Sequence, residues 1–94
     1  MDRTFSWDAW KAAGNFRKHG ISFEEASSAF TDPFCHTFHD LEHSIAEERL
    51  LLIGRSDKGH LLIVAHVERG DDDYRLISAR LAARRERIMY EEGD

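Results

Sequence analysis

Five residues in the second half of this 94-residue chain have the types needed for chemistry on a phosphodiester. Transfer of a phosphoryl group to a neighbouring ribose hydroxyl requires a proton acceptor, cations for the phosphoryl oxygens, and a proton donor for the leaving oxygen. The chain offers these types in Arg75, Arg80, His66, Glu86 and Tyr90. The first hypothesis is therefore metal-free RNA cleavage, with Arg80 on the phosphoryl group and His66 or Glu86 exchanging protons.

Arg80 is the best candidate for phosphate binding. It ends a predicted strand, where sites commonly form, and no acid nearby in the sequence is an obvious partner for it. Arg75 and Arg80 are five residues apart, so in an unbroken strand they project to opposite faces and cannot share one phosphate without a bulge. We therefore expect one of them to be structural. Arg75 fits that role better, because Glu68 lies across a turn from it.

The other three candidates have two interpretations each. His66 either takes a proton in the reaction or is a core histidine satisfied by a backbone carbonyl, since Leu62 and Val64 share its predicted face. Glu86 and Tyr90 are four residues apart on a predicted helix. They either hold one another, as packed helix neighbours do, or serve as a proton carrier and as a hydroxyl donor or platform.

Candidate RNA-binding residues lie nearer the start of the chain. Lys11, Asn15 and Lys18 are spaced so that they project from one face of a predicted helix, where they would contact phosphate or sugar. An ordinary solvated helix face has the same appearance. Arg55 begins a predicted turn, and it either joins this RNA-binding set or only decorates the turn.

A metal site is the rival interpretation of a histidine-rich stretch. Cys35, His36, His39 and His43 are spaced closely enough to suggest zinc or nickel. In a strand, however, His36 and His39 point to opposite faces. We therefore expect no metal and no cofactor.

The elements that must position these residues follow from local signals. Asp8 and Gly20 bound a helix over 9–19, Ser22 to Glu25 forms a capping box for a second helix, and Asp32-Pro33 ends it. Strands are predicted at 5–7, 34–39, 49–55, 61–68 and 74–80, with a last helix at 82–92. The layout predicts one α+β domain over residues 1–94. It has two N-terminal helices, an antiparallel sheet of three to four strands, and a C-terminal helix.

Composition narrows the class of protein further. The net charge is −5, yet the cations cluster at 3–19 and 80–87, with only one acid in each segment. This balance suits an enzyme that visits RNA briefly better than a protein that coats it. The single cysteine forms no internal disulfide, and no segment reads as a signal peptide or membrane span, so we expect a cytoplasmic protein.

The order of motifs along nearly the whole chain resembles the BrnT family of toxins. The motifs are W-D…K…N…K-H-G…F-E-E-A…F-x-D-P…H…E-x-R…G-R-S…H-x-E-R-G…R-x-I-S-A-R…R-R-E-R…Y-E. His43 falls at the family's histidine. The E-x-R motif matches loosely, because Glu47 and Glu48 both precede Arg49. The resemblance implies a RelE-like fold and an endoribonuclease that blocks translation.

The resemblance also implies partners. A BrnA-like ribbon-helix-helix antitoxin would neutralise the toxin in a hetero-oligomer, and operator DNA would be bound only through the antitoxin. RNA would be the substrate, and no membrane would be involved. The alternative function is a noncatalytic module that uses the same basic surface to bind protein or RNA.

Overall fold

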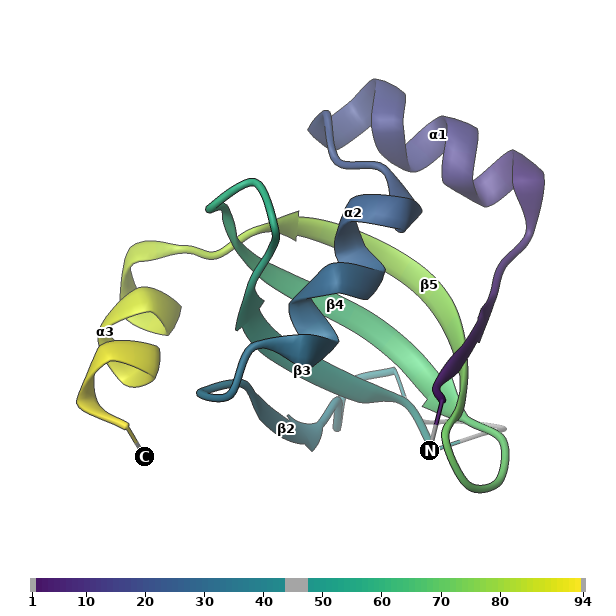
Figure 1. Ribbon diagram of the computed structural model, residues 1–94. Coiled ribbons are helices and arrows are strands. Elements are labelled where there is room, and N and C mark those ends of the chain that lie inside the picture. The colour runs from purple at the N-terminus through teal and green to yellow at the C-terminus, as the bar shows by residue number, and fades with distance from the viewer. Residues whose placement is uncertain (1, 44–47, 94) are drawn as a thin grey trace.

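The computed structural model describes residues 2–43 and 48–93. The elements in chain order are β1 (Thr4–Ser6), α1 (Ala9–His19), α2 (Phe23–Ser28), the 3-10 turn η1 (Ala29–Thr31), β2 (His36–His39), β3 (Leu50–Arg55), β4 (Leu61–Glu68), β5 (Asp73–Leu81) and α3 (Arg84–Glu92) (Figure 1). The α+β class is confirmed. None of these helices has the length and apolarity to cross a membrane.

The strands form one mixed sheet in the order β1-β5-β4-β3-β2. Neighbours from β2 to β5 are antiparallel, whereas β1 pairs in parallel with β5 through Thr4 and Asp73. The prediction of three to four antiparallel strands is therefore wrong in both number and direction. The cause is the pairing of β1 with a strand near the far end of the chain, which no local pattern encodes.

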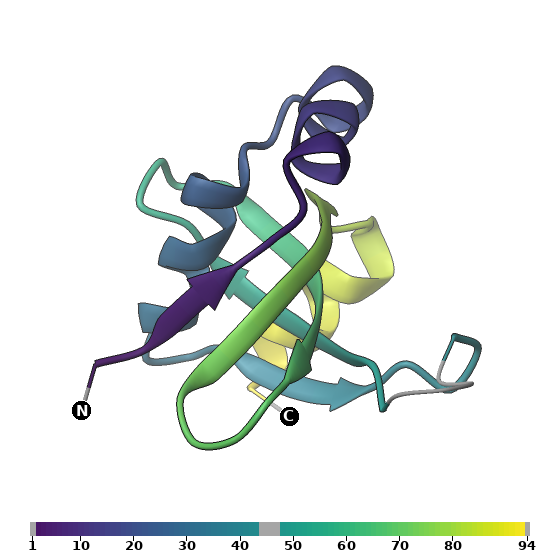
Figure 2. The same ribbon diagram turned by 90° about the vertical axis from the view of Figure 1, so that its right-hand side faces the viewer.

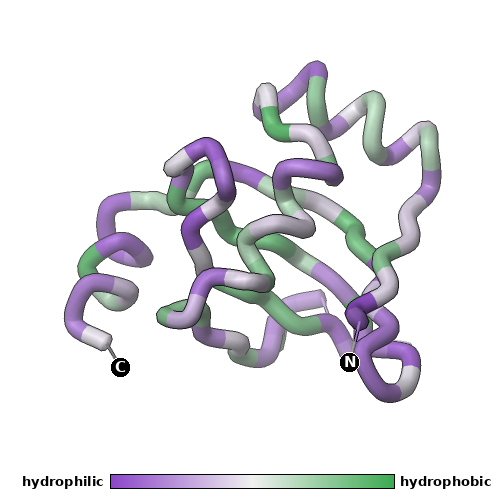
Figure 3. Tube along the Cα trace, in the orientation of Figure 1, coloured by the Kyte–Doolittle hydropathy of each residue, from purple (hydrophilic) through white to green (hydrophobic). Residues whose placement is uncertain are grey.

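Helices cover the two faces of the sheet unequally. On one face, α1, α2 and η1 enclose the larger core, built on Phe23, Phe30, Leu62 and Val64. On the other, α3 covers a smaller cluster at one end of the sheet (Figures 1 and 2). We call these the α1/α2 face and the α3 face. Hydrophobic residues accordingly concentrate in the central strands, and hydrophilic ones in the outer helices (Figure 3).

Local caps fix the helices on the α1/α2 face. The Asp8 carboxylate accepts hydrogen bonds from the first turn of α1, and Gly20, with φ of 72°, ends it, so the predicted bounds are confirmed. The Ser22 hydroxyl likewise accepts from the Glu25 N–H. The buried Glu25 carboxylate does not close the capping box, however. It accepts hydrogen bonds from Ser56 at 2.6 Å and His60 at 2.7 Å, which ties α2 to the turn between β3 and β4.

A β-bulge in β5 changes which side chains share a face. Ser78 lies opposite Ala65 and Leu76 lies opposite His66, which leaves Ile77 without a partner on β4. Residues paired across a ladder point the same way, so Arg75, Ser78 and Arg80 all project from the α3 face. The prediction that Arg75 and Arg80 face opposite sides is therefore wrong.

The same register separates Arg75 from its predicted partner. Glu68 pairs with Tyr74 on the α1/α2 face, while Arg75 pairs with Val67 on the α3 face. The two side chains consequently point away from each other. The expected Glu68–Arg75 contact is wrong.

Candidate functional site

The part of the α3 face that α3 leaves open contains a cleft of about 300 Å³. Its floor comes from the central strands, and its walls from β5, the segment after β2 and the residue that precedes β3. The lining residues are Leu51, Ile63, Ala65, Ser78, Arg80, Asp40, Glu42, His43 and Arg49. This volume suits a small polar group such as one sugar-phosphate unit.

Arg80 is held in this cleft by Glu86. Its two terminal nitrogens donate to the two Glu86 oxygens at 2.8 Å each, and Nη1 also donates to the Leu81 carbonyl at 3.2 Å. The sequence offered no obvious partner for Arg80, and the structure supplies one in Glu86, which lies six residues further along the chain. The chain turns back directly after β5, which brings the first turn of α3 to the end of that strand.

This contact leaves a second edge of the guanidinium open. Of its five N–H donors, three are used by Glu86 and Leu81, and those on Nε and one on Nη2 have no acceptor among residues 2–43 and 48–93. These two donors lie side by side, in the arrangement that binds two oxygens of one phosphate. The side chain is 41% exposed, so a ligand can reach it.

The position of Glu86 favours an orienting role over proton transfer. The hydrogen bonds from Arg80 lower the pKa of this carboxyl, and the same contact raises the pKa of Arg80. Glu86 Oε1 also accepts from the Ala83 N–H at 2.7 Å, which caps α3. An ionised carboxylate with both oxygens occupied is a poor proton carrier at neutral pH.

His66 lies on the opposite side of the sheet from Arg80. It is fully buried, packs against Phe30 and Tyr74, and has its Nδ1 3.2 Å from the Val64 carbonyl. Burial lowers the pKa of the ring, and its Nε2 has no hydrogen-bond partner among the described residues. The geometry matches the core-histidine interpretation, and the prediction that His66 and Arg80 share a site is wrong.

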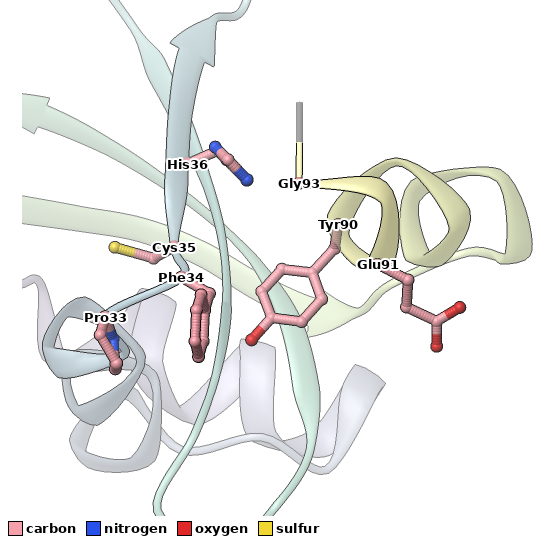
Figure 4. Close-up of a pocket in the computed structure, with 7 residues that line it drawn as sticks. All are labelled: Pro33, Phe34, Cys35, His36, Tyr90, Glu91 and Gly93. Carbon is pink, nitrogen blue, oxygen red and sulfur yellow. The ribbon is translucent and has the colours of Figure 1, made fainter.

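Tyr90 and Arg55 also lie outside the cleft. The Tyr90 hydroxyl donates to Asp32 at 2.6 Å, and the Arg55 guanidinium lies 5.7 Å from the centre of the Tyr90 ring. Arg55 also donates to the Gly59 carbonyl within its turn. Tyr90 lines a separate pocket of about 470 Å³, where its hydroxyl points towards Phe34 (Figure 4).

The three residues expected to bind RNA on α1 differ from one another. Asn15 is buried and bonds both backbone groups of Ala79 in β5, accepting at 3.0 Å and donating at 2.9 Å, and it donates to the Ile21 carbonyl. It is a structural clamp, so the prediction of a free RNA-binding side chain is wrong. Lys11 and Lys18 are exposed, on a helix that packs against the opposite face from the cleft.

The residues that sequence reasoning left out of the site are Asp40, His43, Arg49 and Ser78. Two signals pointed to this region, since His43 and Arg49 fall at the H and E-x-R positions of the BrnT pattern. A backbone hydrogen bond holds Asp40 and Arg49 side by side, since the Asp40 N–H donates to the Arg49 carbonyl at 2.9 Å. Glu47, one of the two acids that could fill E-x-R, lies outside the described residues.

The histidine-rich stretch does not assemble a metal site in the described part of the chain. His36 is opposite Ile53 and His39 is opposite Leu50, so the two side chains project to opposite faces as expected. His39 instead lies 2.8 Å from Glu48. No group of three His, Cys, Asp or Glu side chains gathers among the residues described.

Comparisons with known proteins show the family and a similar fold. The fold is similar to the 1.1 Å crystal structure of the Brucella abortus ribonuclease toxin BrnT, with a TM-score of 0.65 and 24% identity. That match covers 87% of this chain and 99% of the other. No curated protein matches the sequence. Residues 7–86 match the family model described as "Ribonuclease toxin, BrnT, of type II toxin-antitoxin system". This chain therefore belongs to the BrnT family of ribonuclease toxins.

Proposed function

We propose that the chain is a metal-independent endoribonuclease that cleaves RNA in the cleft around Arg80. The observation that carries the proposal is the open edge of the Arg80 guanidinium, which Glu86 holds in place on a side chain that is 41% exposed. A phosphodiester bound there is fixed through two oxygens, and the cation stabilises the extra negative charge of the transition state. Arg49 adds a second cation at the same cleft.

The reaction begins with the ribose 2′-hydroxyl of the bound RNA. Its oxygen attacks the adjacent phosphorus, the bond to the 5′-oxygen breaks, and the products carry a cyclic phosphate and a 5′-hydroxyl. Ser78 lies on the same face of β5 as Arg80 and supplies a hydroxyl for the sugar or phosphate. Arg75 lies further along the strand on the same face, where it meets a flanking phosphate.

Further parts of the proposal come from the family. Membership of a type II toxin–antitoxin family implies an antitoxin partner, which we propose to be BrnA-like, with a ribbon-helix-helix part that carries the complex to operator DNA. We also assign the fold to the RelE-like group and the site of action to the cytoplasm. Cleavage of messenger or ribosome-bound RNA would block translation.

The test is cleavage of end-labelled RNA by the purified, antitoxin-free protein in excess EDTA. Arg80→Ala is compared with Arg87→Ala, which removes an exposed arginine of α3 that does not line the cleft. We expect fragments with 5′-hydroxyl and cyclic phosphate ends from the wild type. Arg80→Ala should lower kcat about 10²–10³-fold, and Arg87→Ala should leave it within about threefold.

Two outcomes would contradict the proposal. Cleavage that disappears in EDTA and returns with a divalent metal would show that the reaction is not metal-independent. No cleavage by the folded wild type, with ribosomes also supplied, would favour the noncatalytic binding module. In that case Arg80→Ala would weaken binding without any turnover to lose.

A further inference from the structure

His43 and Asp40 form a pair at the wall of the cleft opposite the strand that carries Arg80. His43 Nδ1 lies 3.1 Å from each oxygen of the Asp40 carboxylate, and the His43 N–H faces the Asp40 carbonyl at 3.3 Å. Both residues line the same cleft as Arg80 and Arg49. The pair is thus built into the candidate site, although the two residues follow β2 and lie far from β5 in the sequence.

Burial divides the pair into a fixed part and an accessible part. The Asp40 side chain is 11% exposed, while the His43 side chain is 60% exposed. A carboxylate only accepts hydrogen bonds, so it selects the tautomer of the imidazole that carries its proton on Nδ1. The lone pair then lies on Nε2, on the far side of the ring from Asp40. This is the arrangement in which an aspartate orients a histidine to take a proton.

We propose that His43 is the proton acceptor of the cleavage reaction and that Asp40 is its positioning residue, which rests on the proposed function. His43 Nε2 takes the proton of the 2′-hydroxyl as the bond from O2′ to phosphorus forms. The bond from phosphorus to O5′ breaks, and O5′ takes a proton from water. The imidazolium then returns its proton to solvent, so the histidine ends as it began.

The charges around His43 fit this role. The charged groups that line the cleft with it are the carboxylates of Asp40 and Glu42 and the guanidiniums of Arg49 and Arg80. Asp40 stabilises the imidazolium that forms during the reaction, while the two arginines stabilise the phosphoryl oxygens. His66 supplies none of this, because it is buried on the other face.

The experiment measures kcat and KM for RNA cleavage from about pH 5 to 9 with three variants. His43→Ala removes the base, and Asp40→Asn keeps the size of the positioning residue but removes its charge. His39→Ala is the matched control, since His39 is also an exposed histidine, 59% accessible, that lies 2.8 Å from an acid, Glu48. It differs in projecting from the α1/α2 face.

We expect His43→Ala to lower kcat by about 10²–10⁴-fold with little change in KM, and added imidazole to restore part of the rate. Asp40→Asn should lower kcat with little change in KM, because the imidazole loses the carboxylate that orients it and that stabilises the imidazolium as it forms. His39→Ala should behave as the wild type. If Asp40→Asn does not fold, the kcat of His43→Ala with and without added imidazole still tests whether His43 is the proton acceptor.

Two results would overturn the assignment, and they are distinguishable. If His43→Ala keeps the kcat and pH profile of the wild type while Arg80→Ala is inactive, the pair is not catalytic and the proposed function stands. If the folded wild type does not cleave RNA at any pH, the proposed function fails and the assignment fails with it.

Discussion

Replacing Asn15 with alanine should destabilise the protein strongly, because this side chain replaces a missing strand at the edge of β5. Beyond the short β1, which pairs only with residues 73–75, β5 has no neighbouring strand on that side among the residues that the structure describes. The Asn15 amide pairs there with both the N–H and the carbonyl of Ala79 and also holds the Ile21 carbonyl. Alanine leaves all three backbone groups without these partners.

The size of the effect follows from these contacts. Each buried hydrogen bond contributes about 1 kcal/mol net, so three lost bonds cost about 3 kcal/mol. The higher helix propensity of alanine offsets this loss of folding free energy by roughly 0.5 kcal/mol. The net loss of about 2–3 kcal/mol is a large share of the roughly 5–15 kcal/mol that stabilises a typical domain. The melting temperature should fall by roughly 10–20 °C.

Urea unfolding followed by circular dichroism measures this change as a lower midpoint at constant slope. Lys18→Ala is the control, since Lys18 is exposed on the same helix and should change the free energy of unfolding by less than about 0.5 kcal/mol. An Asn15→Ala variant as stable as the wild type, with a raised KM for RNA, would refute the reasoning and restore the RNA-contact interpretation.

Three further outcomes are expected. Glu86→Gln should lower kcat/KM for RNA roughly 10–100-fold, because Arg80 is then held less firmly, and the shape of the pH–rate profile should not change. If the variant instead loses one limb of the pH–rate profile, Glu86 is a proton carrier. Burial keeps the folded pKa of His66 below its unfolded value of about 6.5, so the stability it contributes is present above that pH and lost as pH falls below it. His66→Phe should remove that part of the pH dependence in urea unfolding at about pH 7.5 and 5.5. Tyr90→Phe should cost about 1 kcal/mol, and a double-mutant cycle with Asp32→Asn should show coupling, since the hydroxyl bonds that carboxylate.

Where a signal lies within a few residues, the sequence was sufficient to predict the structure. Asp8 and Gly20 bound α1 as expected, because a cap acts on the turn beside it. The apolar Leu62 and Val64 also indicated a core position for His66, since side chains two residues apart on a strand share a face, and all three are buried.

The features that sequence reasoning missed depend on contacts between distant segments. Glu25 has the spacing of a capping box, yet its carboxylate turns to Ser56 and His60, which tertiary folding brings beside it. The cleft likewise joins residues near position 40 to residues near position 80. The order of the strands in the sheet determines which acids and cations lie together in such a site. Local periodicity in the sequence does not predict that order.

The unpaired Ile77 shifts the alternation of side chains between the two faces of β5 by one residue. Ahead of it, odd-numbered Arg75 points to the cleft side, and after it even-numbered Ser78 and Arg80 do so. Deleting residue 77 would place Leu76 next to Ser78, which already pair with His66 and Ala65 at adjacent positions of the ladder, so both halves of β5 would keep their faces and only the bulge would be lost. Inserting one residue elsewhere in the strand would instead reverse the faces of one half, which would carry an arginine into the layer of Phe30 or a core residue into solvent. A scan of this strand should therefore tolerate both substitution and deletion at position 77 and reject a one-residue insertion beside Ala79.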